Sequence, residues 1–171
     1  MHPRFERART AELRCPGGTI EVGLAEGFGL RLIGLMRLDA DEMEPLLFPR
    51  CRSIHTYAMK AAIDVVWLTV EGDQARVLEV VESLGPGRHA SAPRGAARRI
   101  AAALELLPGD AERLGLTAGI ECRIKRRSGA EPDDRYWPAS SASPSSSPGT
   151  SDSLTPAASL SFGALMLRSS P

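Results

Sequence analysis

The residues with the clearest chemical capacity are Cys51, Ser53 and His55, which alternate along one short segment. In an extended segment alternate side chains share a face, so the thiol and the imidazole fall on the same side. A histidine base next to a cysteine can activate it as a nucleophile. However, residues four apart on a strand lie about 13 Å apart along its axis, so direct contact requires a bend. We therefore expect no preformed catalytic pair and interpret Cys51 as a buried, unreactive thiol.

Cys51 and His55 are also ordinary zinc ligands. A structural zinc site needs four ligands and a catalytic site needs three, whereas the other candidates are scattered singly along the chain. These other candidates are His89, Cys15, Cys122 and Asp64. The spacing predicts neither a metal site nor a cofactor. For His55 we favour a structural role, in which the ring bonds neighbouring groups through its two nitrogens.

Asp64 is an acid on the apolar face of a predicted strand, where Val66, Leu68 and Val70 also point. Burying a carboxylate without a partner costs several kcal/mol, so it must meet a donor, lie at a sheet end or face a pocket. The structural alternative is an ion pair or a carboxylate that accepts backbone N–H bonds. The functional alternative is a general base or a ligand-binding acid in a cleft. We favour the structural role, with candidate donors Arg31, His55, Lys60 and Arg88.

A candidate polar cluster for ligand binding follows from these residues. If its members line one cavity, a ligand site is credible, and if they lie on separate faces they belong to the scaffold. The cluster consists of Arg31, His55, Met59, Asp64 and Arg88.

The elements that must position these residues are short. The pattern predicts a hairpin of strands 10–15 and 19–25, a central strand over 63–70 and its partner over 75–84. Residues 46–48 and 120–125 are further extended pieces, and helical turns are expected within 27–37 and over 111–114. Residues 96–107 fit a helix by composition or a strand by alternation. The sum is an α+β, mainly β fold: a compact, small, barrel-like domain with an antiparallel or mixed sheet and one or two short helices.

Composition divides the 171-residue chain into two parts. Serine dominates residues 139–161, which hold three prolines and one charged residue, Asp152. Such a segment cannot bury enough apolar area to offset its conformational entropy. We expect a single β-rich domain over 8–127 and a Ser/Pro-rich, disordered C-terminal tail over 128–171.

Charge argues against nucleic acid as a partner. The chain has 21 Lys and Arg against 21 Asp and Glu, and no aromatic residues interleave with its local basic runs. We interpret those runs as solvated surface. They are Arg88, Arg94, Arg98 and Arg99, and then Arg123, Lys125, Arg126 and Arg127, with the acidic loop residues Asp39, Asp41, Glu42 and Glu44 as alternative partners.

Cysteine usage indicates a reducing compartment. The three cysteines are an odd number without C-x-x-C spacing, which favours free thiols and a cytoplasmic location. No apolar stretch follows the charged N-terminus, so we expect no secretory signal. The longest apolar run, near 63–70, is too short for a membrane-spanning helix.

Several motifs in order resemble a bacterial and archaeal family, domain of unknown function 192. The resemblance covers about Thr19 to Ile124, and the ordered series is more specific than any single motif. The motifs are Arg31-Leu32-Ile33-Gly34-Leu35-Met36-Arg37, Leu46-Leu47-Phe48, Cys51-Arg52-Ser53-Ile54-His55-Thr56-x-x-Met59-Lys60, Ile63-Asp64-Val65-Val66-Trp67-Leu68, Pro86-x-Arg88 and Leu104-Glu105-Leu106-x-x-Gly109, with Gly115 and Gly119.

The resemblance implies a compact, mainly β domain and favours a strand over 101–106. Because no activity is established for that family, it implies a fold and not a function. Two local features depart from the family pattern: Ala62 stands where proline is usual, and the loop over 38–44 is unusually acidic.

We expect a small, non-catalytic module that binds a small-molecule or protein partner. The alternative is a hydrolase-like or thiol-dependent enzyme that uses Asp64 and His55, with or without Cys51. The reactivity of Cys51 separates the two, since a catalytic thiol reacts fast at neutral pH and a buried one is protected.

Overall fold

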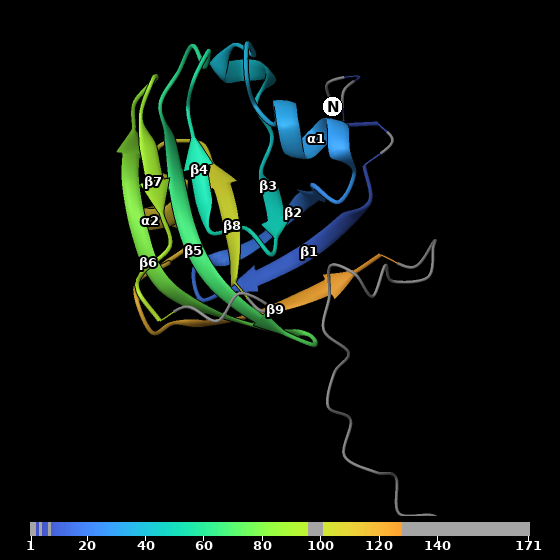
Figure 1. Cartoon of the computed structure of the whole chain (residues 1–171). Coiled ribbons are helices and arrows are strands. Elements are labelled where there is room, and N and C mark those ends of the chain that lie inside the picture. The colour runs from blue at the N-terminus through green and yellow to red at the C-terminus, as the bar shows by residue number, and fades with distance from the viewer. Residues whose placement is uncertain (1–2, 4, 7, 96–100, 128–171) are drawn as a thin grey trace, which may run out of the picture. The chain divides into compact units, whose positions relative to one another are not determined.

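The computed structural model describes residues 3, 5–6, 8–95 and 101–127. Within them seven strands close into a barrel in the order β1-β2-β3-β8-β5-β6-β9 (Figure 1). β2 and β3 run parallel, and every other neighbouring pair runs antiparallel. The predicted mainly β, barrel-like fold is therefore confirmed. The barrel strands are β1 (Thr10–Cys15), β2 (Gly18–Leu24), β3 (Leu46–Pro49), β5 (Ile63–Glu71), β6 (Gln74–Leu84), β8 (Ala101–Leu106) and β9 (Glu121–Arg126).

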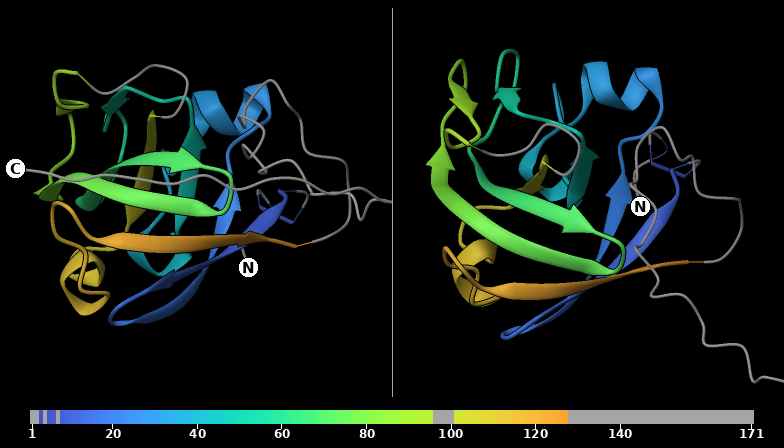
Figure 2. Two further views of the ribbon diagram at one scale, coloured as in Figure 1. Left: turned by 90° about the horizontal axis from the view of Figure 1, so that it is seen from below. Right: turned by 60° about the horizontal axis from the view of Figure 1, so that its bottom comes forward.

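The remaining described elements are short. β4 (Ser53–His55) and β7 (His89–Ser91) form a separate two-stranded antiparallel sheet. Helix α1 (Phe28–Ile33) and helix α2 (Asp110–Arg113) lie on opposite sides of the barrel (Figure 2), and a 3-10 turn spans Ala40–Glu42. No helix in the described part of the chain has the length and apolarity needed to cross a bilayer. The predicted tail over 128–171 lies outside the described residues, and the domain boundaries 8–127 stay a prediction.

The predicted order of elements is confirmed along most of the barrel. β5 is central, with β6 on one side and β8 on the other, as its β-branched composition predicted. The helical stretch expected within 27–37 is shorter, because the chain leaves α1 at Gly34 with a φ of +47°. At the β1–β2 turn, Gly17 approaches α2 so closely that a Cβ would collide with the backbone oxygen of Arg113.

The ambiguous segment 96–107 contains strand β8, and residues 96–100 lie outside the described part. β8 pairs with β3 on one edge and with β5 on the other. Its backbone N–H and C=O groups can bond to these neighbours only when the segment is extended. This tertiary pairing overrides the helix propensity of its alanines and leucines. All six residues of β8 are buried, which means that apolar groups cover both of its faces.

Two hydrophobic clusters lie on the two sides of the β3-β8-β5 wall. The first fills the barrel interior, because all seven strands contribute to it, and α2 adds Ala111 with Leu114 following it. The second lies outside the barrel, between this wall and the layer that contains α1 and β4. Along β8, Ala102, Leu104 and Leu106 belong to the interior cluster and Ala103 to the outer one. Alternation therefore turns Glu105 outward, into the second cluster.

Candidate functional site

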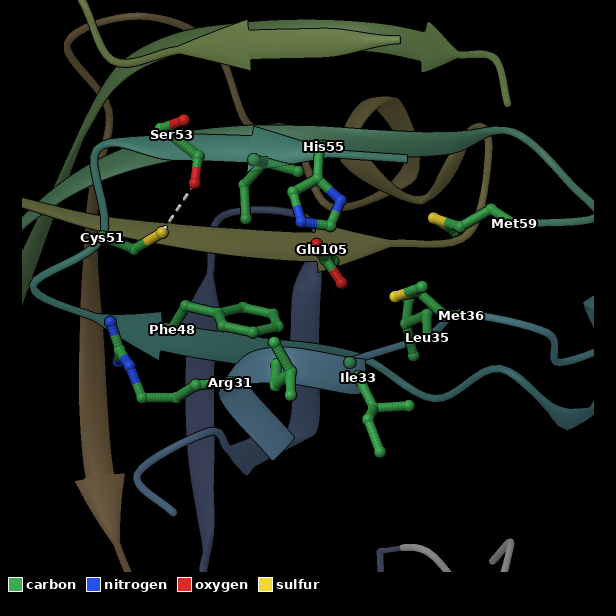
Figure 3. A pocket seen from close by; sticks show the side chains of 13 residues that line it. Arg31, Ile33, Leu35, Met36, Phe48, Cys51, Ser53, His55, Met59 and Glu105 are labelled. Atoms are coloured by element: carbon green, nitrogen blue, oxygen red, sulfur yellow. Dashed lines mark hydrogen bonds between the residues drawn. The ribbon is translucent and has the colours of Figure 1, made fainter. Parts of the chain in front are cut away.

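A pocket of about 180 Å³ opens between the α1 segment and the outer face of the barrel wall (Figure 3). The chain from α1 to Met36 forms one side, β4 with its flanking residues forms another, and β3 and β8 form the floor. Most lining side chains are apolar. The lining residues are Arg31, Leu32, Ile33, Gly34, Leu35, Met36, Phe48, Cys51, Ser53, Ile54, His55, Met59 and Glu105.

Glu105 is the buried acid of this pocket. Its side chain comes from β8, and the residue is 5% exposed. Burial, with no charged neighbour opposing it, raises the pKa of its carboxyl to about 8. Its Oε2 atom is buried and has no hydrogen-bond partner among the described residues. A buried polar atom without a partner is uncommon in folded proteins and requires an explanation.

Gly34 packs closely against Phe48 and the Glu105 carboxyl. A Cβ at this position would lie 3.2 Å from Phe48 Cζ and 3.8 Å from Glu105 Oε2. The residue also has a φ of +47°, a backbone conformation that residues other than glycine rarely adopt. The glycine thus serves both the turn that ends α1 and the close packing of this segment against Phe48.

Arg31 fixes α1 to the barrel rather than pairing with the acid. Its guanidinium donates to the carbonyl oxygens of Pro49 at 2.7 Å and Ala25 at 3.3 Å. In Figure 3 the guanidinium points toward the Cys51 side of the pocket, and Glu105 lies on the other side of Phe48. Arg31 therefore supplies positive charge to one end of the pocket only.

Cys51, Ser53 and His55 all line the pocket, but each makes a different contact. Cys51 Sγ donates to the backbone oxygen of Ser53 at 3.2 Å, and burial raises the pKa of this thiol. The Ser53 hydroxyl bonds His89 Nε2 at 2.8 Å. The His55 ring stacks on Tyr57, with centroids 5.1 Å apart. The thiol thus donates to a backbone carbonyl and not to the imidazole.

Asp64 lies on the other side of the wall. Its carboxylate accepts backbone N–H bonds from Ser83 at 2.9 Å, Gly109 at 2.8 Å and Ala111 at 3.3 Å. Of the structural alternatives, backbone donors rather than an ion pair satisfy this acid. It joins the end of β6 to the start of α2, and it does not line the pocket. Of the candidate donors, Lys60 instead bonds Asp39 at 2.9 Å.

The structure brings together three members of the candidate polar cluster. Arg31, His55 and Met59 line one pocket, whereas Asp64 and Arg88 do not. The Arg88 side chain is exposed, and its backbone N–H donates to the Thr56 hydroxyl at 2.8 Å.

The zinc-ligand candidates are spread over the fold. Among the described residues, no three His, Cys, Asp or Glu side chains meet as metal ligands. Cys15 and Cys122 share a hydrogen bond with each other. Neither lies in the pocket with Cys51 and His55.

Sequence reasoning missed Glu105, although the signal was present. The residue lies between Leu104 and Leu106 in an alternating segment, as Asp64 lies between Ile63 and Val65. An acid within a strand that is apolar on both sides is either satisfied or functional. The sequence around Asp64 predicts a strand without a competing interpretation, whereas residues 96–107 also fit a helix, so the argument reaches Glu105 only once β8 is known.

Comparison with known proteins supports the fold. The profile of the family DUF192, described as "Uncharacterized ACR", matches residues 11–124. A crystal structure of a protein of unknown function from Novosphingobium aromaticivorans is similar with a TM-score of 0.51 and 20% identity, over 66% of this chain and 82% of that one. A candidate transcription regulator from Sinorhizobium meliloti has a TM-score of 0.49 and 22% identity, over 69% and 92% of the two chains. No curated protein matches the chain.

Proposed function

This chain belongs to the DUF192 family, whose description names no activity, and from the pocket geometry we propose that the domain binds a small ligand beneath α1. The observation that carries the proposal is the unpartnered, buried Oε2 of Glu105 inside a cavity. A ligand that donates a hydrogen bond to this oxygen removes the cost of leaving it unsatisfied.

The size of the cavity restricts the ligand. At about 180 Å³ it is smaller than the roughly 300–1,000 Å³ of pockets that hold drug-sized molecules. The occupant is therefore a small molecule, or one terminal group of a larger one. The proposal keeps the binding module expected from the sequence and adds a candidate pocket for it.

The rim of the pocket gives the outer part of a ligand an apolar surface. α1 has no buried residues, and its Phe28 is 82% exposed while Leu32 is 59% exposed. Leu32 and Ile33 also line the pocket. Exposed apolar side chains grouped beside a cavity are typical of binding surfaces.

A second hollow, near Thr69, Gln74 and Glu121, is larger at about 260 Å³. Its lining residues contribute no buried side-chain atom without a hydrogen-bond partner. The larger volume alone is a weaker argument than an unsatisfied carboxyl, so we place the ligand beneath α1.

The catalytic alternative has less support. Asp64 and His55 lie on opposite sides of the barrel wall, and both oxygens of Asp64 already accept backbone hydrogen bonds. Burial raises the pKa of Cys51 and outweighs the opposing charge of Arg31, which disfavours the thiolate that a nucleophile requires. The predicted cytoplasmic location stays a prediction.

A fragment screen followed by amide chemical shifts in NMR spectra tests the proposal. We expect small fragments to shift the amides of Phe48, Ile54 and Glu105, while those of Gln74 and Glu121 at the other hollow stay unchanged. Shifts confined to the second hollow, or no shifts with any fragment, would overturn it.

A further inference from the structure

We propose that the ligand carries a protonated amine on a short apolar body, and that this ammonium group pairs with the carboxylate of Glu105. The inference rests on the proposed function and names the chemical class of the ligand.

The charge balance of the pocket lacks a cation at Glu105. Burial is the one cause of its raised pKa, so no neighbouring positive charge stabilises the carboxylate. Three other titratable side chains line the pocket: Arg31, Cys51 and His55. The Arg31 guanidinium is bound to the carbonyls of Pro49 and Ala25, and the His55 ring stacks on Tyr57. An ammonium group supplies both a hydrogen-bond donor for Oε2 and the missing opposite charge, whereas an alcohol supplies only the donor.

The surroundings of the acid fit a hydrocarbon stem. Leu35, Phe48 and Ile54 are buried apolar side chains of the lining, and the thioethers of Met36 and Met59 lie beside them (Figure 3). Methionine adapts to irregular apolar ligands because its side chain is unbranched and flexible. An aromatic ring near the carboxyl also favours a cation over an anion. A chain of about four carbons with a terminal ammonium is of suitable size for so small a cavity.

Binding of this class displaces a proton. In the free domain near neutral pH the carboxyl of Glu105 is mostly protonated, because its pKa is about 8. When R–NH₃⁺ binds, Glu105–COOH becomes carboxylate, the ion pair forms, and one H⁺ goes to solvent. The affinity for an ammonium ligand must therefore rise with pH up to about 8, by as much as tenfold per pH unit. A neutral ligand, or an anion beside Arg31, shows no such rise.

Three probes of equal length separate the classes: n-butylammonium, 1-butanol and butyrate. Each is titrated into the full chain at pH 6, 7 and 8, with affinities taken from amide chemical shifts. We expect n-butylammonium to bind most tightly, with an affinity that increases toward pH 8. A fourth probe, Nα-acetyl-lysine methylamide, represents a lysine side chain of a protein partner. If the cavity excludes a peptide backbone, this probe does not bind and n-butylammonium does, which indicates a free amine as the ligand.

Variants provide the matched control. Glu105→Gln keeps the size of the side chain but cannot become a carboxylate, so we expect it to lose at least tenfold in butylammonium affinity together with the pH dependence, and to keep its affinity for 1-butanol. Glu79→Gln, on the exposed face of β6, should behave as the unmodified chain. If Glu105→Gln does not fold, the ¹³C shift of the Glu105 carboxyl can be titrated against pH in the unmodified chain. Butylammonium should then lower the pKa of this carboxyl, because the ion pair stabilises the carboxylate.

The outcomes distinguish this inference from the proposed function. If 1-butanol or butyrate binds as tightly as n-butylammonium at pH 8 and shifts the same amides, the ammonium inference is wrong and the pocket remains a ligand site. If no probe shifts the amides of Phe48, Ile54 and Glu105, the inference is overturned, and an equally negative fragment screen overturns the pocket as well.

Discussion

Asp64 and Glu105 are buried carboxyls on paired strands of one barrel wall, and they face opposite sides of it. In the β5–β8 register Asp64 pairs with Leu106, and Glu105 pairs with Val65. The inward acid accepts three backbone N–H bonds, whereas Oε2 of the outward acid accepts none from the described residues. The first is therefore satisfied by the fold itself, and the second is the acid that we propose a ligand satisfies.

The raised pKa of Glu105 predicts that the domain loses stability as pH increases. The pKa is about 8 in the folded state against an ordinary 4.5, so the folded state binds more protons between these values. The contribution of this group to the free energy of unfolding is then greatest below about pH 4.5 and falls toward pH 8, by at most about 1.4 kcal/mol per pH unit. Urea unfolding at a series of pH values measures the slope.

Glu105→Gln should remove this part of the pH dependence, because the amide does not titrate. Glu79→Gln, which changes an exposed residue of β6, should leave it in place. Equal slopes for Glu105→Gln and the unmodified chain between pH 5 and 8 would contradict the burial of this carboxyl.

Asp64→Ala should destabilise the domain by about 3–5 kcal/mol, because three backbone N–H groups lose their acceptor at the β6–α2 junction. The midpoint of urea unfolding measures the loss. Glu82→Ala, at an exposed position on β6, is the control and should change stability by less than about 0.5 kcal/mol. An unchanged midpoint for Asp64→Ala would mean that the carboxylate does not hold this junction.

Gly34→Ala should weaken both the fold and the pocket. The added Cβ meets Phe48 Cζ at 3.2 Å, and the positive φ strains any residue with a side chain, so we expect a loss of about 1 kcal/mol or more. Thermal unfolding and butylammonium titration measure the two effects. Gly29→Ala, in α1 with no atom within 4 Å of the new Cβ, should be neutral or slightly stabilising and should bind normally.

Thr56→Val should cost about 2 kcal/mol of stability. The buried hydroxyl donates to Gly85 O at 2.6 Å and accepts from Arg88 N at 2.8 Å, which joins the end of β4 to the loop before β7. Valine has nearly the same shape but leaves both backbone groups without this partner. Thr117→Val, at an exposed site, is the matched control in the same melting experiment, and equal melting temperatures would refute the role of the hydroxyl.

Cys51 should react slowly with iodoacetamide at neutral pH, because the residue is buried and burial raises the pKa of its thiol. Site-resolved mass spectrometry measures the rate against that of the urea-unfolded chain. A ligand in the pocket should slow the reaction further, since Cys51 is part of the lining. Modification as fast as in the unfolded chain would favour the catalytic alternative.

Local pattern predicted much of the barrel, and the reasons differ between strands. β5 is predictable because its β-branched residues and the turn that follows it favour a strand and no other element. β8 was ambiguous because alanine and leucine favour a helix in isolation, and its strand character depends on pairing with β3 and β5. The three-residue strands β4 and β7 pair across 34 residues of sequence from His55 to His89, a relationship that periodicity does not encode.

The site was predicted only in part, because the long-range pairing of the strands decides which residues meet. His55 and Met59 share the pocket with Arg31 because the β4 segment folds over the outer face of the wall. Asp64 was correctly predicted to be buried, but alternation along β5 does not say which face is the barrel interior. Glu105 could be assigned to the outer face only once the register of β8 was known.

One face of β8 packs in the barrel interior and the other lines the pocket, so both faces constrain its register with β3 and β5. A slip of one residue would carry the Glu105 carboxyl into the barrel interior and expel Leu104 into the pocket. The misaligned chain would lose a packed interior and a recognition surface in one step. A register error at this wall would therefore cost both interior packing and the pocket surface. These two costs define the register of a strand whose alanine-rich sequence does not by itself favour strand over helix.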